Sequence, residues 1–260
     1  MAPLPRGYLS HSQIRLYSEC PQKYYFAYIE EIPARVNEKV FLGEIFHAIV
    51  EDYFTRVING SRPTAAATIA AFHESFMVQE KERDIDWQVS RRETRARGSA
   101  FVKYFLAHIA PKLKPLMVER ELSAEIPEIG VTVKGVIDLV EADFSITDFK
   151  TTTSKWSASK ARNSLQMVIY KYLFDRNFGH VHGALKYEIL HAKNADHIRH
   201  QRLVVTPGPE ETAQMLRVVR HVAENICAGA FYPQTNHFCS YCDFFAACRE
   251  KNPGLLVCKR

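Results

Sequence analysis

The sequence lacks any long apolar run. Of its 260 residues, 47% are hydrophobic and 24% are charged, yet no apolar stretch comes near the ~20 residues that a membrane-spanning helix needs. The opening residues, MAPLPRGYLS, also lack the apolar segment of a secretory signal. These absences argue against a membrane protein, and we expect a soluble, cytoplasmic one.

Internal repeats and low-complexity linkers are absent as well, so the chain is neither a repeat array nor a string of modules. We therefore predict a single domain over residues 1–260. The formal net charge of +5 favours a polyanionic partner. No recognition helix or other base-reading module is evident, which disfavours sequence-specific binding of nucleic acid.

Cysteine is scarce over most of the chain and crowded at its end. Cys20 stands alone near the start, whereas the other five of the six cysteines lie from Cys227 to Cys258. In an intracellular chain, thiols with this distribution are metal ligands or buried side chains more often than disulfides. We expect Cys227 to be a buried side chain and Cys258 an exposed thiol.

Three of the late cysteines form a metal-ligand pattern, C-x-x-C with a third cysteine after five residues: Cys239, Cys242 and Cys248. Four thiolates complete a tetrahedral zinc site or hold an iron–sulfur cluster. Cys20 is the natural fourth ligand, and His237 is the alternative. With Cys20 as the ligand, the tail at 229–260 would pack against residues 9–30.

The first half of the chain has helical periodicity. Ser10 and Gln13 fit a capping box at the start of a short helix, and Pro21 suits the first position of a second one. An amphipathic pattern covers residues 41–58 and predicts a helix there. The pattern stays helical over 64–110 with a polar break at 79–87, and we predict a helical insertion at 55–112.

The period then changes to that of strands. Alternating segments predict strands at 115–127, 131–140 and 144–150, a helix at 159–178, two more strands at 183–193 and 197–206, and a helix at 209–229. This order predicts an α/β fold, in which a mixed central sheet is flanked by helices.

Two acids lie where strands should be apolar. Asp138 stands between Ile137 and Leu139, although a carboxylate in a strand interior loses its hydration. Asp148 lies on the next strand, and Lys150 shares its face because side chains alternate along a strand. We take the loop to be 141–143.

That loop would pair Val140 with Phe144 and Val136 with Asp148, which makes Asp138 and Asp148 a diagonal pair with Cα atoms roughly 7–8 Å apart. The carboxylates would converge on a hard divalent cation such as Mg²⁺ or Mn²⁺. Lys150 could orient or deprotonate a water, or stabilise developing charge. Taken alone, D-x-K is so common that it favours a solvated hairpin edge with an incidental Asp–Lys pair.

Residues elsewhere can complete such a site. Gly43, His47 and Glu51 fall at four-residue steps, on one face of the predicted helix. Taken alone, a histidine such as His47 is more often a partly buried or capping side chain than a metal ligand. Gln166 and Tyr170 are also four residues apart, and by themselves they would be interface residues between a helix and the sheet.

Taken together, these residues resemble the PD-(D/E)XK nuclease superfamily, and within it the RecB-like branch. The matching segments are GEIFH, GVID, DFK and QMVIY, in that order, with LSHSQIRLYSECPQKYYFAY looking like the branch's opening segment. They correspond to its G-x-x-x-H, G-x-x-D, D-x-K and Q-x-x-x-Y signatures. The resemblance runs from about residue 9 to residue 248.

The resemblance implies a role for each matching residue. His47, Asp138, Asp148 and the Phe149 carbonyl would bind Mg²⁺ or Mn²⁺, and Lys150 would be the catalytic lysine. Gln166 and Tyr170 would contact the DNA backbone or orient the site. Glu119 and Glu121 on the preceding strand could support the metal ligands from behind, or could be exposed strand charges.

For the cysteines, the resemblance is to the iron–sulfur subset of the branch, which includes AddB-type proteins and the CRISPR-adaptation nucleases. It implies that Cys20, Cys239, Cys242 and Cys248 hold a 4Fe–4S cluster. Zinc is the alternative.

The expected function is that of a Mg²⁺- or Mn²⁺-dependent deoxyribonuclease, an exonuclease on DNA ends or single strands in recombination, repair, replication or phage DNA processing. The alternative is a non-catalytic DNA-binding or assembly protein with the same fold. Binding would be independent of sequence, with Arg91–Arg97, Lys155, Lys160 and Arg162 as phosphate contacts or as solvated charges. The oligomeric state is not predicted.

Overall fold

The structure, a computed structural model, describes residues 4–179, 182–236, 239 and 242–254. The chain divides into two compact units. Unit 1 comprises Met1–Ala34, Ser123–Gly135 and Pro209–Arg260, and unit 2 comprises Arg35–Leu122 and Val136–Gly208. The strands β4 (Pro115–Ile126) and β5 (Val131–Glu141) each run from one unit into the other. A single domain stays a prediction.

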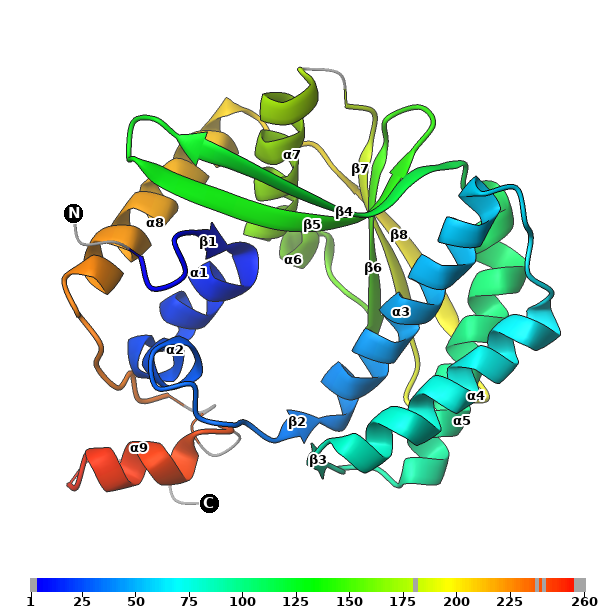
Figure 1. Ribbon diagram of the computed structural model, residues 1–260, viewed down its shortest axis with the longest axis horizontal. Coiled ribbons are helices and arrows are strands. Elements are labelled where there is room, and N and C mark those ends of the chain that lie inside the picture. The colour runs from blue at the N-terminus through cyan, green and yellow to red at the C-terminus, as the bar shows by residue number, and fades with distance from the viewer. Residues whose placement is uncertain (1–3, 180–181, 237–238, 240–241, 255–260) are drawn as a thin grey trace. The chain divides into compact units, whose positions relative to one another are not determined.

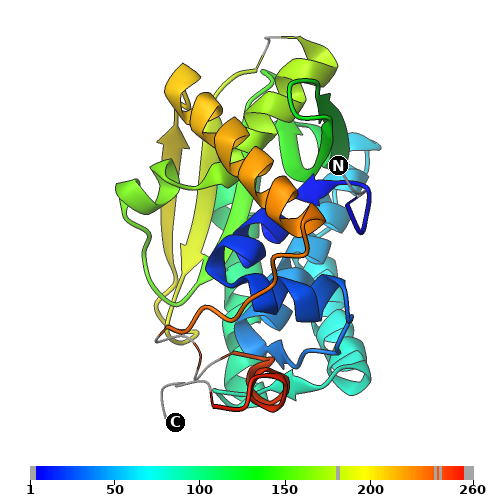
Figure 2. The same cartoon turned by 90° about the vertical axis from the view of Figure 1, so that its left-hand side faces the viewer.

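Unit 1 is built from short elements near both ends of the chain. Its elements are β1 (Leu9–Ser10), α1 (His11–Glu19), α2 (Pro21–Tyr28), α8 (Pro209–Cys227) and α9 (Phe245–Lys251). Figure 2 shows α1 beside α8. The Ser10 side chain accepts a hydrogen bond from the Gln13 N–H, and Pro21 begins α2, so both predicted helix starts are confirmed. The helix α9 was not predicted.

Aromatic side chains form the core of unit 1. Tyr24 and Phe26 are buried, and the Tyr17 hydroxyl donates to the Ala230 carbonyl at 2.6 Å. The Gln22 N–H donates to the Tyr232 carbonyl at 3.0 Å. These contacts place the segment after α8 beside the first two helices.

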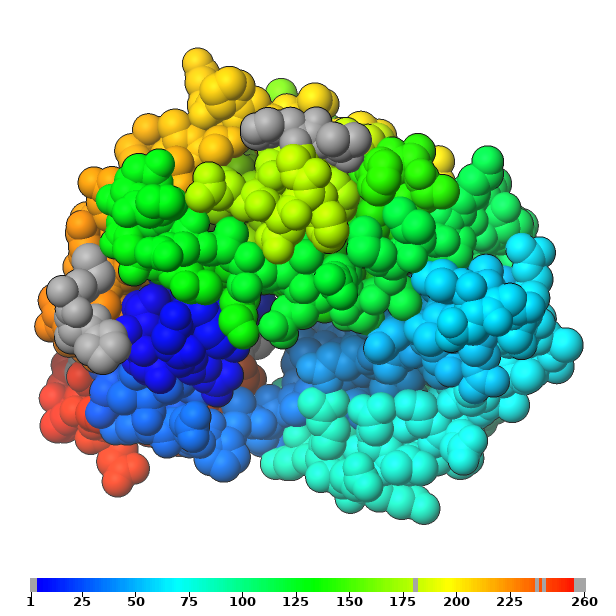
Figure 3. Space-filling model, turned by 45° about the horizontal axis from the view of Figure 1, so that its top comes forward, coloured from blue at the N-terminus to red at the C-terminus, as the bar shows by residue number. Residues whose placement is uncertain are grey.

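The helical part of unit 2 lies between residues 36 and 112. It contains β2 (Val36–Asn37), α3 (Glu38–Ile58), α4 (Ala65–Glu82), β3 (Ile85–Asp86), α5 (Arg91–Tyr104), a π-helical turn (Phe105–Ile109) and a 3₁₀ turn (Ala110–Lys112). Figure 3 shows α4 (cyan) on the surface of this unit. Asn37 caps α3 by accepting from the Lys39 N–H at 2.9 Å, so the helix begins before the predicted residue 41.

No helix within the described ranges is long and apolar enough to cross a membrane.

The sheet of unit 2 is mixed, as predicted. The second half of β5 pairs antiparallel with β6 (Ile146–Thr152), β6 pairs parallel with β7 (Leu185–His191), and β7 pairs antiparallel with β8 (Arg199–Val205). A parallel pair needs a crossover connection, and α6 (Ala158–Arg162) and α7 (Leu165–Phe178) supply it (Figure 1).

The strand register sorts side chains onto two faces. Asp148 lies beside Tyr187, and Lys150 lies beside Ile189 and then Gln201; we call this the Asp148 face, which α7 approaches. The other is the Phe149 face. There the Phe149 ring stacks on Phe54 of α3, with ring centroids 6.2 Å apart.

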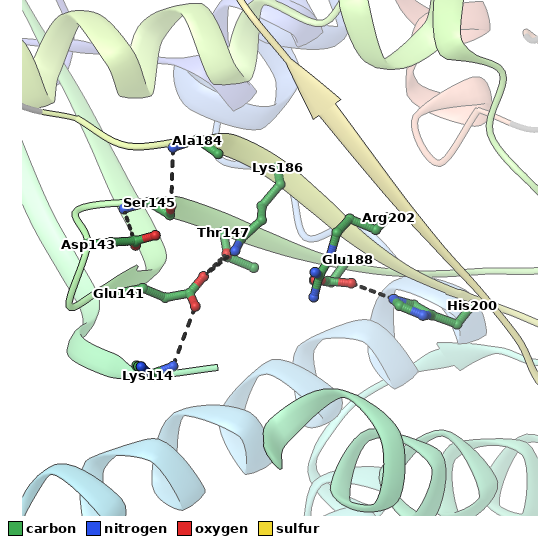
Figure 4. Close-up of polar contacts among 10 residues, drawn as sticks. All are labelled: Lys114, Glu141, Asp143, Ser145, Thr147, Ala184, Lys186, Glu188, His200 and Arg202. Carbon is green, nitrogen blue, oxygen red and sulfur yellow. Dashed lines mark hydrogen bonds and ion pairs between the residues drawn. The ribbon is translucent and has the colours of Figure 1, made fainter. Parts of the chain in front are cut away.

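Buried carboxylates on the Phe149 face are compensated by neighbouring donors (Figure 4). Glu141 accepts from the Thr147 hydroxyl at 2.9 Å and pairs with Lys186 Nζ at 2.6 Å. Glu188 pairs with His200 and with Arg202, whose Nε lies 2.6 Å from its Oε1. A buried charge is tolerated when it is paired in this way, so these contacts fix β8 against β7.

The predicted register of β5 and β6 is wrong by two residues. Val140 lies opposite Ile146, not Phe144. The loop is longer than predicted because Phe144 adopts a left-handed backbone (φ 60°) and the Asp143 carboxylate accepts from the Ser145 N–H at 3.0 Å. A shift of two keeps every side chain on its predicted face. Continued by one residue, the register puts Asp138 directly opposite Asp148.

Two smaller expectations also need correction. The helix predicted at 159–178 is broken at Asn163–Ser164, where the Ser164 side chain caps α7. Arg97 is 3% exposed, and its Nη1 donates to the Lys193 carbonyl at 3.5 Å. Arg97 is therefore a buried side chain and is not available to contact phosphate.

We expect Gly98→Ala to destabilise the protein, because an added Cβ at Gly98 would collide with the Phe72 ring and the Leu42 side chain. Overpacking of this kind costs about 1–3 kcal/mol, which lowers the urea midpoint of unfolding. Gly43→Ala is the matched control. A Cβ there lies 3.5 Å from Thr151 Oγ1, an ordinary contact, and alanine favours a helix interior by about 0.5–1 kcal/mol. Equal losses in both variants would contradict this packing.

Candidate active site

The site begins where β5 and β6 part. Among the described residues, the strand register of this hairpin comprises the pairs Leu139–Thr147 and Val140–Ile146, and at the loop end the Glu141 N–H donates to the Ser145 carbonyl. Beyond them the Phe149 N–H has no β5 carbonyl opposite, and it donates to Asp138 Oδ2 at 2.8 Å. A side-chain carboxylate thus replaces a backbone acceptor, which explains why an acid stands inside an apolar strand.

Asp148 is fully buried. Its Oδ1 accepts from Gln166 Nε2 at 2.7 Å, and its Oδ2 lies 2.6 Å from Lys150 Nζ. Burial raises the pKa of Asp148 to about 6, with Lys150 lowering it and Asp138 raising it further. The charge of Asp138 therefore opposes the ionisation of Asp148, and Lys150 offsets only part of the rise in the pKa of Asp148.

Gln166 and Tyr170 form the wall of the site on α7. Gln166 stands in the first turn of that helix, and its Nε2 also donates to the Tyr170 hydroxyl at 2.9 Å. Tyr170 is 5% exposed; its burial, together with Asp148, raises the pKa of Tyr170 well above the ordinary value. Gln166 thus contacts Asp148 from inside the protein, and Tyr170 contacts Gln166.

His47 reaches the site from α3. Its Nδ1 lies 3.3 Å from Asp138 Oδ2, and 28% of its side chain is exposed. The imidazole therefore faces both the carboxylate and solvent. One helical turn earlier, Gly43 packs near Thr151 of β6, and this close approach of α3 to the sheet brings His47 within reach of β5.

Glu119 completes the cluster and was not in the predicted metal set. Atoms of His47, Glu119 and Asp138 all lie within 4.8 Å of one another. Glu119 has a left-handed backbone (φ 43°) within β4, a conformation typical of a β-bulge that re-aims a side chain. Glu121, two residues later, is exposed. No sequence pattern distinguishes the two glutamates, because only the backbone twist separates them.

The pKa of Glu119 reflects its burial and the negative charge around it. Burial and then Asp138 raise the pKa of Glu119 from the ordinary 4.5 to about 7. An imidazole and two crowded carboxylates form a donor set that suits Mg²⁺ or Mn²⁺. The residues present therefore fit a divalent ion, since such an ion would remove the repulsion that these pKa shifts record.

The structure thus brings His47 and Asp138 together with Glu119, whereas Asp148 is held toward Lys150 and Gln166. The predicted metal ligation by Asp148 and by the Phe149 carbonyl stays a prediction. The Phe149 ring, 1% exposed, belongs to the core on the opposite face of the sheet.

The four predicted cysteine ligands line one cavity in unit 1. The cavity has a volume of about 510 Å³, and its lining includes Cys20, Cys239, Cys242 and Cys248. Burial raises the pKa of the Cys248 thiol, and the other three cysteines raise it further. His237 and Cys258 lie outside the described residues. Cys227 does not line this cavity.

Backbone amides point at two of these sulfurs. The Gln234 N–H donates to Cys20 Sγ at 3.4 Å, and the Asn236 N–H donates to Cys239 Sγ at 3.3 Å. Hydrogen bonds of this kind stabilise thiolates bound to a metal. Among the described residues, the carboxylate–imidazole cluster above is the one group of three ligands within 4.8 Å, so no three of these sulfurs are that close.

Comparisons with known proteins bear on this geometry. A family model described as the PD-(D/E)XK nuclease superfamily matches residues 8–249. The chain is similar to the solved structure of an exonuclease candidate from Eubacterium rectale, with 12% identity, a TM-score of 0.58, and coverage of 97% of this chain and 90% of that one. The chain is also matched to the solved structure of SSO0001, with 16% identity and coverage of 94% of this chain and 96% of that one. The TM-score of 0.37 is too low to indicate a shared fold. No curated protein matches.

We expect Glu119→Gln to stabilise the metal-free protein, more strongly at pH 8 than at pH 5. The pKa of Glu119 is higher in the folded state, so folding loses stability as pH rises from about 4.5 to about 7. Glutamine abolishes that loss. In EDTA at pH 8, the melting temperature should rise by about 2–4 °C, or about 1 kcal/mol in a chain of this size.

Glu121→Gln, on the same strand but exposed, is the matched control and should show no pH-dependent gain. A Glu119→Gln effect that is the same at both pH values would show that this carboxyl does not lie in a crowded acidic cluster.

Proposed function

Because the chain belongs to the PD-(D/E)XK nuclease superfamily, we propose that it is a Mg²⁺- or Mn²⁺-dependent DNA nuclease of the RecB-like branch. The observation that carries the proposal is the grouping of Asp138, Asp148 and Lys150 around the parting of β5 and β6. Glu119 and His47 complete the acidic cluster. These are the residue types that metal-assisted hydrolysis of a phosphodiester uses, and this supports the proposal.

His47, Glu119 and Asp138 would hold the ion, with Asp148 and the Phe149 carbonyl as the further ligands that the family pattern assigns. A bound Mg²⁺ or Mn²⁺ would polarise the scissile phosphodiester and lower the pKa of a water. Lys150, held by Asp148 at 2.6 Å, would orient that water or stabilise charge on the phosphate. Gln166 and Tyr170 keep Asp148 in place, so they act by positioning.

The proposed substrate is DNA, bound without regard to sequence and cut from its ends or as a single strand. The absence of a base-reading module in the sequence and the basic residues Lys155, Lys160 and Arg162 support this choice. The proposed setting is recombination, repair, replication or phage DNA processing.

We expect Asp148→Ala and Lys150→Ala each to reduce cleavage of end-labelled DNA by at least about 100-fold in Mg²⁺ or Mn²⁺. Loss of a positioned proton-transfer group such as Lys150 costs about 10²–10⁴-fold, and Asp148 holds Lys150 in place. Single-stranded and duplex substrates should be assayed in parallel. Asp52→Ala is the control, because Asp52 pairs with Arg56 on the surface of α3, the helix that carries His47.

Equal activity in wild type and both site variants, with folding preserved, would refute the nuclease assignment. DNA binding without cleavage in the wild type would instead point to a non-catalytic protein that uses the fold as a scaffold.

We further propose that the cysteine cavity of unit 1 holds a 4Fe–4S cluster. Four thiols line it, backbone N–H groups donate to two of the sulfurs, and the order of the cysteines along the chain is that of the iron–sulfur subset of the branch. Four thiolates can hold such a cluster, and zinc is the alternative. The role is structural: the cluster would join the first two helices to the C-terminal tail.

We expect Cys20→Ser and Cys248→Ser to lose iron and acid-labile sulfide when purified without oxygen, together with the broad visible absorption of the wild type. The melting temperature should fall with the metal. Cys227→Ser is the matched control, because Cys227 lies on α8 and outside the cavity. Stoichiometric zinc without iron in the wild type would establish the alternative, and normal folding after cluster removal would contradict the structural role.

A further inference from the structure

The segment that follows the D-x-K strand carries one of the two tryptophans of the chain, Trp156. It lies between the end of β6 and the start of α6, and the function proposed above assigns it no role. Its side chain is half-buried. On one side its ring meets the Tyr187 ring at a centroid distance of 5.1 Å. Over the ring lies Lys160 Nζ, 4.3 Å from the centroid.

Trp156 stands on the same face of the sheet as the candidate active site. Tyr187 is the register partner of Asp148, and Gln201 lies in line with Ile189 and Lys150. Gln201 contacts Trp156 directly. Neighbouring strands are about 4.8 Å apart, so Gln201 on β8 is roughly 10 Å from Lys150 on β6. A DNA strand at the site would have its adjacent nucleotides within reach of Trp156.

The backbone of Trp156 is held at both of its polar groups. Its N–H donates to Gln201 Oε1 at 2.8 Å, and its carbonyl accepts from Gln201 Nε2 at 3.2 Å. Gln201 is itself fixed, because its neighbours His200 and Arg202 pair with buried Glu188 on the other face (Figure 4). These two hydrogen bonds fix the loop, and with it the place of the Trp156 side chain.

Positive charge surrounds the ring. Lys155 and Lys160 are exposed on either side of it in sequence, and Arg199 faces His191 across the ends of β8 and β7. Burial lowers the pKa of His191, and Arg199 and then Lys155 lower it further, which indicates that these cations gather closely. An aromatic ring set among cations is the combination that holds single-stranded nucleic acid.

We propose that Trp156 stacks on an unpaired base of the DNA strand that lies at the active site, with Lys160 moving from the ring to a phosphate. The proposal rests on the nuclease function and specifies its substrate, a strand whose bases are unpaired next to the scissile bond. A base pair in a duplex has no free face to offer there. The alternative is that Trp156 only covers Tyr187.

The chain offers a direct optical test, because Trp87 is the other tryptophan and packs on Phe41 and Phe76. In a Trp87→Phe background, Trp156 is the sole tryptophan. In EDTA, where no cleavage occurs, a short oligo(dT) should quench its fluorescence, and an abasic oligonucleotide of the same length should bind with little quenching. In the reverse variant, Trp156→Phe, the fluorescence comes from Trp87, and oligo(dT) should not quench it.

Affinity provides the second measurement. Trp156→Leu should weaken oligo(dT) binding by about 5- to 150-fold, which corresponds to about 1–3 kcal/mol for one stacked base. Trp156→Phe should retain most of the affinity, and binding of the abasic strand should be the same in all variants. A melting curve verifies that each variant is folded. Equal quenching by the abasic and normal strands, or wild-type affinity in Trp156→Leu, would overturn the proposal.

The outcomes separate the two proposals. Suppose that Asp148→Ala abolishes cleavage, while oligo(dT) does not quench Trp156 and Trp156→Leu binds with wild-type affinity. The nuclease assignment then stands and the stacking is wrong. If the wild type does not cleave DNA but Trp156 is quenched by oligo(dT), the stacking stands and the nuclease assignment fails.

Discussion

One hydrogen bond organises the candidate site: the Phe149 N–H donates to the carboxylate of Asp138. It forms because β5 and β6 part after two paired residues, which leaves a strand amide that must find another acceptor. The same bond draws Asp138 toward His47 and sets it opposite Asp148. Without it, Asp138 would be an unexplained charge in an apolar strand, and the Phe149 N–H would lack the acceptor that it has in Asp138.

The two faces of the sheet treat buried charge differently. On the Phe149 face, Glu141 and Glu188 each have a cationic partner close by. The buried charges of this face are therefore neutralised, and the face serves as scaffold. On the Asp148 face, Asp138, Asp148 and Glu119 share one lysine and one imidazole, and the pKa values of Asp148 and Glu119 are raised. Unbalanced negative charge of this kind would be stabilised by a bound cation, and groups with such shifted pKa values cluster at functional sites.

Much of the fold could be predicted because strand alternation and helix periodicity report burial directly. The faces of Asp138, Asp148 and Lys150 followed from alternation alone and survived a register error of two residues. That error arose from the left-handed Phe144, which no local pattern reveals. The sequence did not predict Glu119 as a metal ligand for a similar reason, since its left-handed backbone within β4 depends on tertiary packing. The burial of Arg97 was hidden too, because an arginine run does not show which member faces the core.

The division of the chain has a consequence for how the protein is made. Unit 2 is complete once residue 208 has been synthesised, whereas unit 1 needs its last segment. Cys20 is synthesised before unit 2, and Cys239, Cys242 and Cys248 are synthesised after it. The four thiols of the cavity can therefore come together only after all of unit 2 has been translated. Any group that needs all four of them is bound after that point.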